Sequence, residues 1–235
     1  MAFLNGKLTI GCEHSPMKGI ALILPLVAML GGCIDIPQVS KRGQVRQSTQ
    51  VVTPRPEARQ CLAELGATRA SFTPVPDKYF GGGCSTVNSV RLAALRSDTD
   101  VLGISNLGPV TCPLANTFAN WARFGVDRAA RQLLGSPLAR IETMGSYNCR
   151  TVAGTSRLSA HATANAIDVS AFVLEDGRRI SVIGDWNSAD PTERDFLRIV
   201  HKSACKRFGT VLGPNYNAAH RDHFHLEFGG SSFCR

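Results

Sequence analysis

Residues 220–228 read HRDHFHLEF, and this stretch indicates both the architecture and the chemistry that we expect of the chain. In a β-strand, successive side chains point to opposite faces of the sheet. One face would carry the polar side chains of His223, His225 and Glu227. The other face would carry the apolar side chains of Phe224, Leu226 and Phe228. The stretch therefore predicts a strand whose apolar face joins the core and whose histidines are free for chemistry.

A second stretch, residues 159–169, reads SAHATANAIDV and adds a histidine and a carboxylate. If its last part is a strand, Asp168 points away from the two apolar residues beside it. A carboxylate among small residues on such a face is costly unless it has a partner. A cation held jointly by His161, Asp168 and His225 would be that partner.

Two imidazoles and one carboxylate suit zinc, and three protein ligands leave a fourth position for a water molecule. The ion would acidify that water to a pKa of about 7. We expect Asp222 to act as the general base, and His223 or Arg150 to stabilise the oxyanion. Manganese or another divalent ion would also fit, because such ligands bind several metals. A single His-x-His pair is more often structural, so the prediction rests on the two stretches together.

The composition allows a folded domain but excludes few functions by itself. Of 235 residues, 43% are hydrophobic and 19% are charged, which supports an apolar core and argues against a disordered chain. No apolar run reaches the ~18 residues that a membrane-spanning helix needs. The net charge of +8 suits an anionic partner, although charge alone does not separate nucleic acid from a cell surface.

The N-terminus predicts export. Residues 19–30 are the most hydrophobic stretch and follow Met17 and Lys18, so residues 1–32 have the pattern of a signal peptide. Because Met17 and Lys18 already form a complete positive start, we expect residues 1–16 to be an over-extended start. An export signal also argues against a nucleic-acid partner.

The residues that end at Cys33 read LGGC and resemble the lipobox of bacterial lipoproteins. We therefore predict lipidation of Cys33, whose several acyl chains would anchor the protein firmly. The alternative is an ordinary signal peptide with a chance cysteine. Ile34 is similar to the sorting residue of outer-membrane lipoproteins, which predicts the periplasmic side of the outer membrane. Residues 33–56, rich in Gln, Ser, Thr, Val and Pro, would be a flexible tether.

The predicted mature domain retains Cys61, Cys84, Cys112, Cys149, Cys205 and Cys234. An even number of cysteines in an exported protein predicts three disulfides. No two of them are spaced C-x-x-C, which argues against a thiolate zinc site or a redox site. Six cysteines allow many pairings, and we expect the pairing of nearest neighbours, Cys61–Cys84, Cys112–Cys149 and Cys205–Cys234.

The remaining patterns predict a domain over residues 57–235 that mixes helices with short strands. Apolar residues recur at helical spacing over residues 114–134, where Gly125 would divide the helix. The buried face of this helix would consist of Leu114, Phe118, Trp121 and Phe124. Further helices are expected over residues 57–65 and 192–207, strands over residues 139–143 and 181–183, and a loop-rich segment over residues 72–86. The expected class is α+β, with a small, mainly antiparallel sheet flanked by helices and stapled by disulfides.

The two histidine stretches resemble the motifs of a known group of enzymes. The pattern S-x-H-x(6)-D followed by H-x-H is similar to that of zinc peptidases that cleave bacterial cell-wall peptides, the D-alanyl-D-alanine carboxypeptidases and murein endopeptidases. Their usual first motif is S-x-H-x-x-G-x-A-x-D. Ser159, His161, Ala166 and Asp168 match it, and Ala164 occupies the glycine position.

From about Glu57 to Arg235 the chain is more similar still to the bacterial extensin-like C-terminal domain family. The resemblance is carried by the segments CLAELGA, GGCSTVNSVRLAAL, TCPLANTFANWA, YNCR, SAHATANAIDVSAF and ACKRFGTVLGPNYNAAHRDHFHLEF. The last segment is highly specific. Alanine in the glycine position belongs to the pattern of this family.

The resemblance implies a zinc-peptidase-like fold and a set of site residues. The zinc ligands of the peptidases fall on His161, Asp168 and His225, and their assisting histidine falls on His223. The arginine that precedes the first motif in those enzymes falls most nearly on Arg150.

The general base depends on the branch of peptidases. In the carboxypeptidase branch it falls on Asp222, whereas the endopeptidase pattern H-x-x-H-x-H falls on His220, His223 and His225. The chain satisfies both patterns, and we favour Asp222 for its pKa and its reach.

The sequence thus predicts an envelope-tethered hydrolase with one zinc ion per chain that cuts amide bonds in peptidoglycan stem peptides or cross-links. A non-catalytic, wall-binding lipoprotein on the same scaffold is the alternative. Peptidoglycan is the expected partner, the N-terminal lipid the only contact with a membrane, and a monomer the expected state.

Overall fold

The computed structural model describes residues 55–230 and 232–235. The predicted signal peptide, Cys33 and nearly all of the predicted tether therefore lie outside the described residues, and their predictions stay predictions. The first described helix is α1 (Pro56–Ala67), which begins one residue before the predicted start of the domain. Proline is well suited to this first helical position, because its missing N–H would have no partner there.

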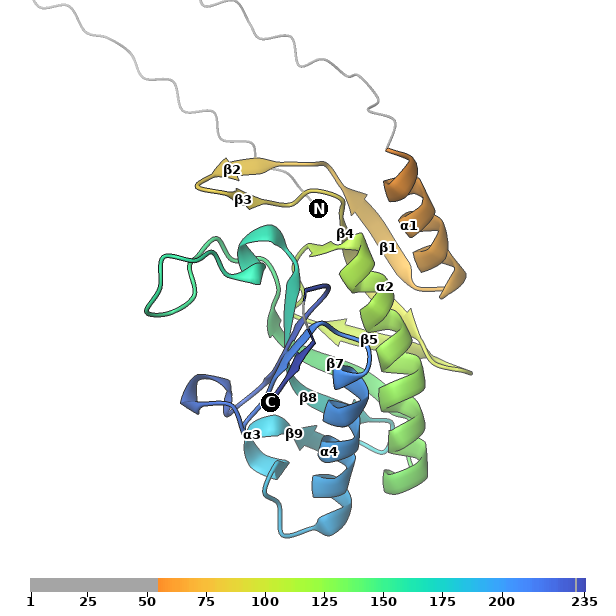
Figure 1. Ribbon diagram of the computed structural model, residues 1–235. Coiled ribbons are helices and arrows are strands. Elements are labelled where there is room, and N and C mark those ends of the chain that lie inside the picture. The colour runs from red at the N-terminus through yellow and green to blue at the C-terminus, as the bar shows by residue number, and fades with distance from the viewer. Residues whose placement is uncertain (1–54, 231) are drawn as a thin grey trace, which may run out of the picture. The chain divides into compact units, whose positions relative to one another are not determined.

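One sheet runs through the described residues in the strand order β1-β4-β5-β7-β8-β11-β10-β12, with β6 beside β4 and β9 beside β8 (Figure 1). The strands are β1 (Ser71–Val75), β4 (Ser89–Arg96), β5 (Val101–Ser105), β6 (Val110–Thr111), β7 (Leu138–Gly145), β8 (Ala166–Leu174), β9 (Arg179–Ser181), β10 (Thr210–Leu212), β11 (Phe224–Glu227) and β12 (Phe233–Cys234). The pairs β5–β7 and β10–β12 are parallel, and the other pairs are antiparallel, so the sheet is mixed. Together with the helices, it confirms the predicted α+β class.

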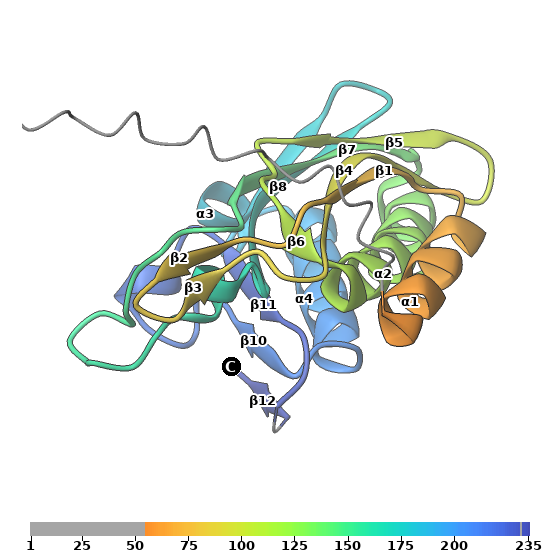
Figure 2. The same cartoon turned by 90° about the horizontal axis from the view of Figure 1, so that it is seen from above.

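The helices pack against this sheet. They are α1, α2 (Cys112–Trp121), the π-helical turns η1 (Ala122–Asp127) and η2 (Ala130–Leu134), α3 (Val182–Asp185) and α4 (Pro191–Cys205), with short 3-10 turns η3 (Ala160–Thr163) and η4 (Ala218–His220). Helix α4 lies beside η1 and η2, which continue α2, and α1 lies next to α2 (Figures 1 and 2).

Aromatic side chains fill the space between the helices and the sheet. Phe172 of β8 packs edge-on against Trp121 of α2 and Phe196 of α4, with ring centroids 6.0 and 5.4 Å apart. The indole N–H of Trp121 donates to the carbonyl oxygen of Val200 over 3.1 Å, so burial leaves no unpaired donor on this ring. Phe224 of β11 lies 6.4 Å from Phe172, which connects the core to the strand that carries the histidines.

The helix predicted over residues 192–207 is confirmed as α4. Asp190 caps it by accepting from the backbone N–H of Thr192 over 2.8 Å, and Pro191 occupies the first helical position.

The helix after Trp121 differs from the prediction in two ways. First, Phe124 is 39% exposed, because the π-helical turns of η1 advance the chain by more residues per turn and shift the apolar stripe. The guanidinium groups of Arg123 and Arg128 lie over the Phe124 ring, 4.9 and 4.7 Å from the centroid.

Second, Gly125 lies inside η1 and does not divide the helix there. A side chain at this position would collide with Trp121 and with α4, so the glycine permits close helix packing.

Two predicted elements need correction. Residues 72–86, predicted as loop-rich, contain β1 and a hairpin of β2 (Tyr79–Gly81) and β3 (Cys84–Ser85). Pro74 is compatible with β1 because this strand lies at the sheet edge. The strand predicted over residues 181–183 ends at Ser181, whose hydroxyl oxygen accepts from the backbone N–H of Gly184 and caps α3.

The three predicted disulfides are present, but two of the predicted pairings are wrong. The structure pairs Cys61 with Cys112, Cys84 with Cys149, and Cys205 with Cys234. Loop closure becomes only slightly more costly as the loop lengthens, so nearest neighbours have a small entropic advantage. The tertiary fold overrides it, because α1 packs on α2 and the β2–β3 hairpin meets the loop after β7.

Candidate metal centre

The two histidine stretches meet as neighbouring strands. β8 and β11 pair antiparallel, and the register places His225 directly opposite Asp168. The apolar residues that alternate with them, Ile167, Val169, Phe224 and Leu226, are fully buried in the core, as predicted. Phe228 is an exception. It is 40% exposed because β11 ends at Glu227, so the alternation no longer applies to it.

His161 reaches the same place from the short turn η3, which precedes β8. The hydroxyl oxygen of Ser159 accepts from the backbone N–H of His161 over 3.3 Å and caps the turn. Ala164 ends the turn with a φ of 55°, a left-handed conformation that favours glycine. The alanine that occupies the glycine position of the peptidase motif therefore has a backbone conformation that glycine adopts more easily.

Two histidine nitrogens and the carboxylate of Asp168 converge. His161 Nε2 lies 3.1 Å from Asp168 Oδ2, and His225 Nδ1 lies 2.8 Å from Asp168 Oδ1. The two histidine nitrogens are 3.2 Å apart. Ligand atoms that each lie about 2.0–2.1 Å from a tetrahedral zinc are about 3.3 Å apart. The predicted set of His161, Asp168 and His225 therefore has nearly the spacing that zinc requires.

The outward nitrogens of both histidines are held by acceptors. His161 Nδ1 meets the backbone carbonyl oxygen of Ser146, and His225 Nε2 lies 2.7 Å from Glu227 Oε1. A carbonyl oxygen and a carboxylate accept hydrogen bonds but do not donate them, so each outward nitrogen carries the proton. A bound ion would replace the protons that the inward nitrogens share with Asp168, and the inward lone pairs would then face that ion, which is the arrangement that metal-ligating histidines adopt.

Burial and charge act strongly on the triad. Only 3% of His161 and 6% of His225 is exposed. Burial opposes the charged form of Asp168, but hydrogen bonds with His161 and His225 outweigh it and hold the pKa of Asp168 well below its usual value. Burial also lowers the pKa of His225, yet its bonds to Asp168 and Glu227 raise that pKa to about 9. Groups with such displaced pKa values are typical of functional sites.

His223 also faces the triad, and Asp222 lies behind it. His223 Nε2 is 3.6 Å from Asp168 Oδ1, while His223 Nδ1 is 2.8 Å from Asp222 Oδ1. The carboxylate that we expected to act as the base is thus joined to His223, and this histidine lies between it and Asp168.

His220 completes the cluster from η4. Its ring lies 5.2 Å from that of His223 and 5.8 Å from that of His225. Burial and the charges of the neighbouring His223 and His225 together lower the pKa of His220 to about 4. Arg150 is exposed in the loop of residues 146–158 between β7 and η3, here named the 146–158 loop, and its charge acts on His220.

Two residues that support the cluster were not predicted. Ser146 acts through its backbone carbonyl, which every residue type possesses, so no sequence signal identifies it. Asn217 accepts from His220 Nδ1 over 2.7 Å and from the backbone N–H of Ala219 over 3.0 Å. The preference of asparagine for the residue that caps a helical turn is a weak signal that could have identified it.

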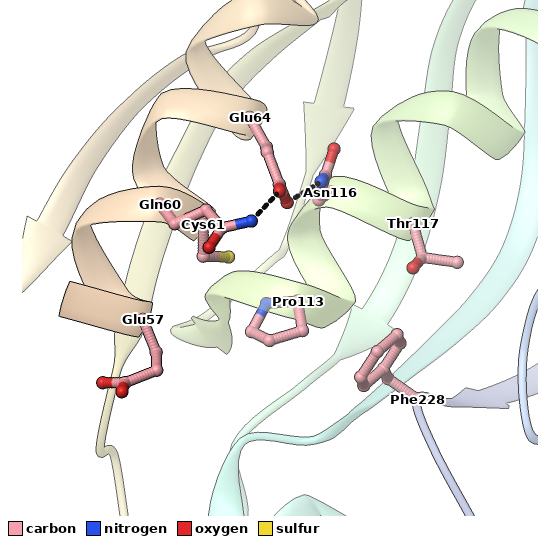
Figure 3. Close-up of a pocket in the computed structure, with 8 residues that line it drawn as sticks. All are labelled: Glu57, Gln60, Cys61, Glu64, Pro113, Asn116, Thr117 and Phe228. Atoms are coloured by element: carbon pink, nitrogen blue, oxygen red, sulfur yellow. Dashed lines mark hydrogen bonds between the residues drawn. The ribbon is translucent and has the colours of Figure 1, made fainter.

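Other features of the described residues do not compete with this centre. His201 lies close to Cys205 and Cys234, but the two cysteines form a disulfide and offer no thiolate. A cleft of about 370 Å³ between α1 and α2 is lined by Glu57, Gln60, Cys61, Glu64, Pro113, Asn116, Thr117 and Phe228 (Figure 3). Its Glu64 accepts from Gln60 over 2.9 Å and from Asn116 over 3.4 Å, and no histidine lines it.

The sequence matches the family model described as extensin-like protein C-terminus over residues 59–235. The chain belongs to this family. The match includes every residue of the histidine cluster, so the cluster lies within the extensin-like domain itself. No curated protein and no solved structure matches the chain. Among the described residues of the extensin-like chain, none of the helices is long and apolar enough to cross a membrane.

Proposed function

We propose that this extensin-like domain is a zinc hydrolase that cuts amide bonds in peptidoglycan stem peptides or cross-links. The observation that carries the proposal is the convergence of three lone-pair donors, two imidazole nitrogens and one carboxylate. Outer partners fix the two imidazoles in that orientation. The likeness of the two motifs to those of zinc peptidases that act on bacterial cell walls supports the choice of substrate. Such a role also agrees with the predicted export and lipid anchor at Cys33.

The ion would be held by His161 Nε2, the carboxylate of Asp168 and His225 Nδ1. When bound, zinc supplies Lewis acidity, which polarises a carbonyl oxygen and makes a water molecule more acidic. Asp168 is the single anionic ligand in this set, and this favours the retention of positive charge at the centre.

His223 and Asp222 act together on the proton in this proposal. His223 Nε2 faces the centre, and Asp222 fixes the ring by accepting the proton of Nδ1. His223 is therefore able to take a proton from the attacking water and to deliver it to the leaving amine. Asp222, which the sequence favours as the base, stabilises the imidazolium that forms, as the carboxylate of a catalytic triad does.

Arginines of the 146–158 loop would meet the substrate. The charge of Arg150 acts on His220, and the charge of Arg157 acts on Glu227, so both side chains lie on the side of the cluster. Both residues are exposed. Stem peptides of the wall carry carboxylates, and guanidinium groups pair with carboxylates in a fixed, often bidentate geometry. We propose that Arg150 holds a substrate carboxylate or the developing oxyanion.

The test is to incubate the purified full chain with bacterial sacculi and to analyse the products by mass spectrometry. We expect new free amines and shortened or uncrosslinked stem peptides, which a chelator abolishes and added zinc restores. His161→Ala should be inactive, whereas His201→Gln, a change outside the cluster, should stay active. Binding to sacculi with no new amine, in protein that holds its zinc, would instead favour a non-catalytic wall-binding protein.

A further inference from the structure

We propose a second, weaker divalent-cation site, formed by His220 and His223 and sharing the carboxylate of Asp168 with the first site. The hydrogen bonds of the cluster support it. Each of the four histidines around Asp168 has one nitrogen bound to an oxygen that lies outside the cluster. These oxygens belong to Ser146, Asn217, Asp222 and Glu227.

The bond to Asn217 decides the tautomer of His220. The amide oxygen of Asn217 is the atom that faces the ring, because this same atom accepts from the backbone N–H of Ala219. An oxygen that accepts cannot supply the proton, so His220 Nδ1 must donate it. His220 Nε2 is then a lone pair that is free to bind an ion.

His223 has the same arrangement of proton and lone pair. The carboxylate of Asp222 receives the proton of Nδ1, which leaves a lone pair on Nε2. That lone pair faces Asp168 Oδ1 at 3.6 Å, which is too long for a hydrogen bond. Two acceptors that face each other across this gap repel unless a positive charge lies between them, and a divalent ion supplies it.

The first site does not include the Nε2 atoms of His220 and His223, because its ligands are His161, Asp168 and His225. His161 Nε2, His225 Nδ1 and the carboxylate of Asp168 lie 2.8–3.2 Å from one another in the first site. Since a nitrogen lone pair binds one ion, His225 Nδ1 is not available to the second site. The ligand atoms of His220, His223 and His225 lie within 4.8 Å of one another, so the nitrogens of His220 and His223 are close enough to share an ion. Asp168 has two oxygens, and Oδ1 faces both His225 and His223, which allows the carboxylate to be shared.

The ligands define the kind of ion and its affinity. Two imidazoles and one shared carboxylate favour zinc, copper, nickel or cobalt over magnesium or calcium. The second site has one ligand of its own fewer than the first site, and its His220 is only half-buried. The second site should therefore release its ion before the first site does. Its consequence for activity rests on the proposed function: an ion on His223 Nε2 occupies the atom that would accept the proton, and excess zinc would therefore inhibit the enzyme.

The experiment is a titration of the metal-free full chain with Zn²⁺ by calorimetry and with Co²⁺ by absorption spectroscopy. We expect two binding events in the native chain, a tight one and a weaker one. His220→Ala should lose only the weaker event and His161→Ala should lose the tight one. Asn217→Ala leaves all ligands in place and should weaken only the second event, on the order of 10–100-fold. Circular dichroism of each variant checks that it folds.

One binding event in the native chain, unchanged in His220→Ala, would overturn the second site. If that single event also disappears in His161→Ala, the proposed hydrolase centre still holds its zinc and only the second site fails. If neither variant alters binding, the ions bind elsewhere and both proposals fail.

Discussion

The two faces of the β8–β11 strand pair differ as much as any two regions of the molecule. On one face, Ile167 and Leu226 are fully buried among the aromatic residues of the core. On the other face, one residue away along each strand, Asp168 and His225 lie opposite each other and form part of the candidate metal centre. The same backbone and the same hydrogen bonds between the strands support both faces.

The comparison teaches that the two faces are specified by different physics. Burial of apolar surface is non-directional and tolerates substitutions of similar volume. The polar face depends on each partner in turn, because a buried polar group that loses its partner is costly. Stability and metal binding should therefore respond separately to changes on the two faces.

The largest effect is expected from Asp168→Asn, which keeps the shape of the side chain but removes its charge. The triad then has no anionic ligand, and tightly bound zinc should fall from one ion per chain to nearly none. Metal analysis after dialysis measures this, with Asp176→Asn, an exposed aspartate bound to Arg178, as the matched control. Stoichiometric zinc in Asp168→Asn would show that the ion binds elsewhere.

A change on the apolar face should lower the stability of the chain and leave its zinc binding intact. Leu226→Ala should lower the free energy of unfolding by about 2–5 kcal/mol, because it leaves a cavity in a packed core. Phe228→Ala, at the exposed end of the same segment, should cost less than ~1 kcal/mol. Urea denaturation measures both, and both variants should keep their zinc below the unfolding transition. Loss of zinc from folded Leu226→Ala would contradict the separation of the two faces.

This contrast also explains how far the sequence could predict the site. The period of two in a strand is a local property, so Asp168 and His225 could be assigned to the polar face from the sequence alone. The partner of Cys61 could not, because it depends on the packing of α1 against α2. The exposure of Phe124 depends on a π-helical turn that residue spacing does not reveal. The contact between His161 and Ser146 uses a backbone atom, which has no sequence signature.

The outer partners of the histidines should have a smaller effect than the ligands. Glu227→Gln keeps an oxygen that can accept from His225 Nε2 but removes the negative charge of the side chain. Zinc affinity should fall on the order of 10–100-fold. Competition with a chelator of known affinity measures this change. Glu175→Gln, at an exposed position, is the control and should bind zinc like the native chain. An unchanged affinity in Glu227→Gln would mean that the charge does not support the ligand.

The smallest effect on the centre is expected from two of the disulfides. The Cys61–Cys112 and Cys84–Cys149 bonds span 51 and 65 residues, so removal of either pair by serine substitution should cost a similar ~2–4 kcal/mol of stability. Only Cys149 adjoins residues that hold His161, through the N–H of Asn148 and the carbonyl of Ser146. Zinc affinity should therefore fall several-fold in the Cys84–Cys149 variant alone. Equal losses in the two variants would indicate a general effect of stability.

The most direct test of the central claim is zinc K-edge X-ray absorption of the purified full chain after dialysis against metal-free buffer, with metal content measured on the same sample. We predict one zinc ion per chain, bound by nitrogen and oxygen ligands at about 2.0–2.1 Å, with the signature of two imidazoles. A chain that retains no zinc after exposure to the ion, or that holds it through sulfur ligands, would contradict the assignment of His161, Asp168 and His225 as a metal centre.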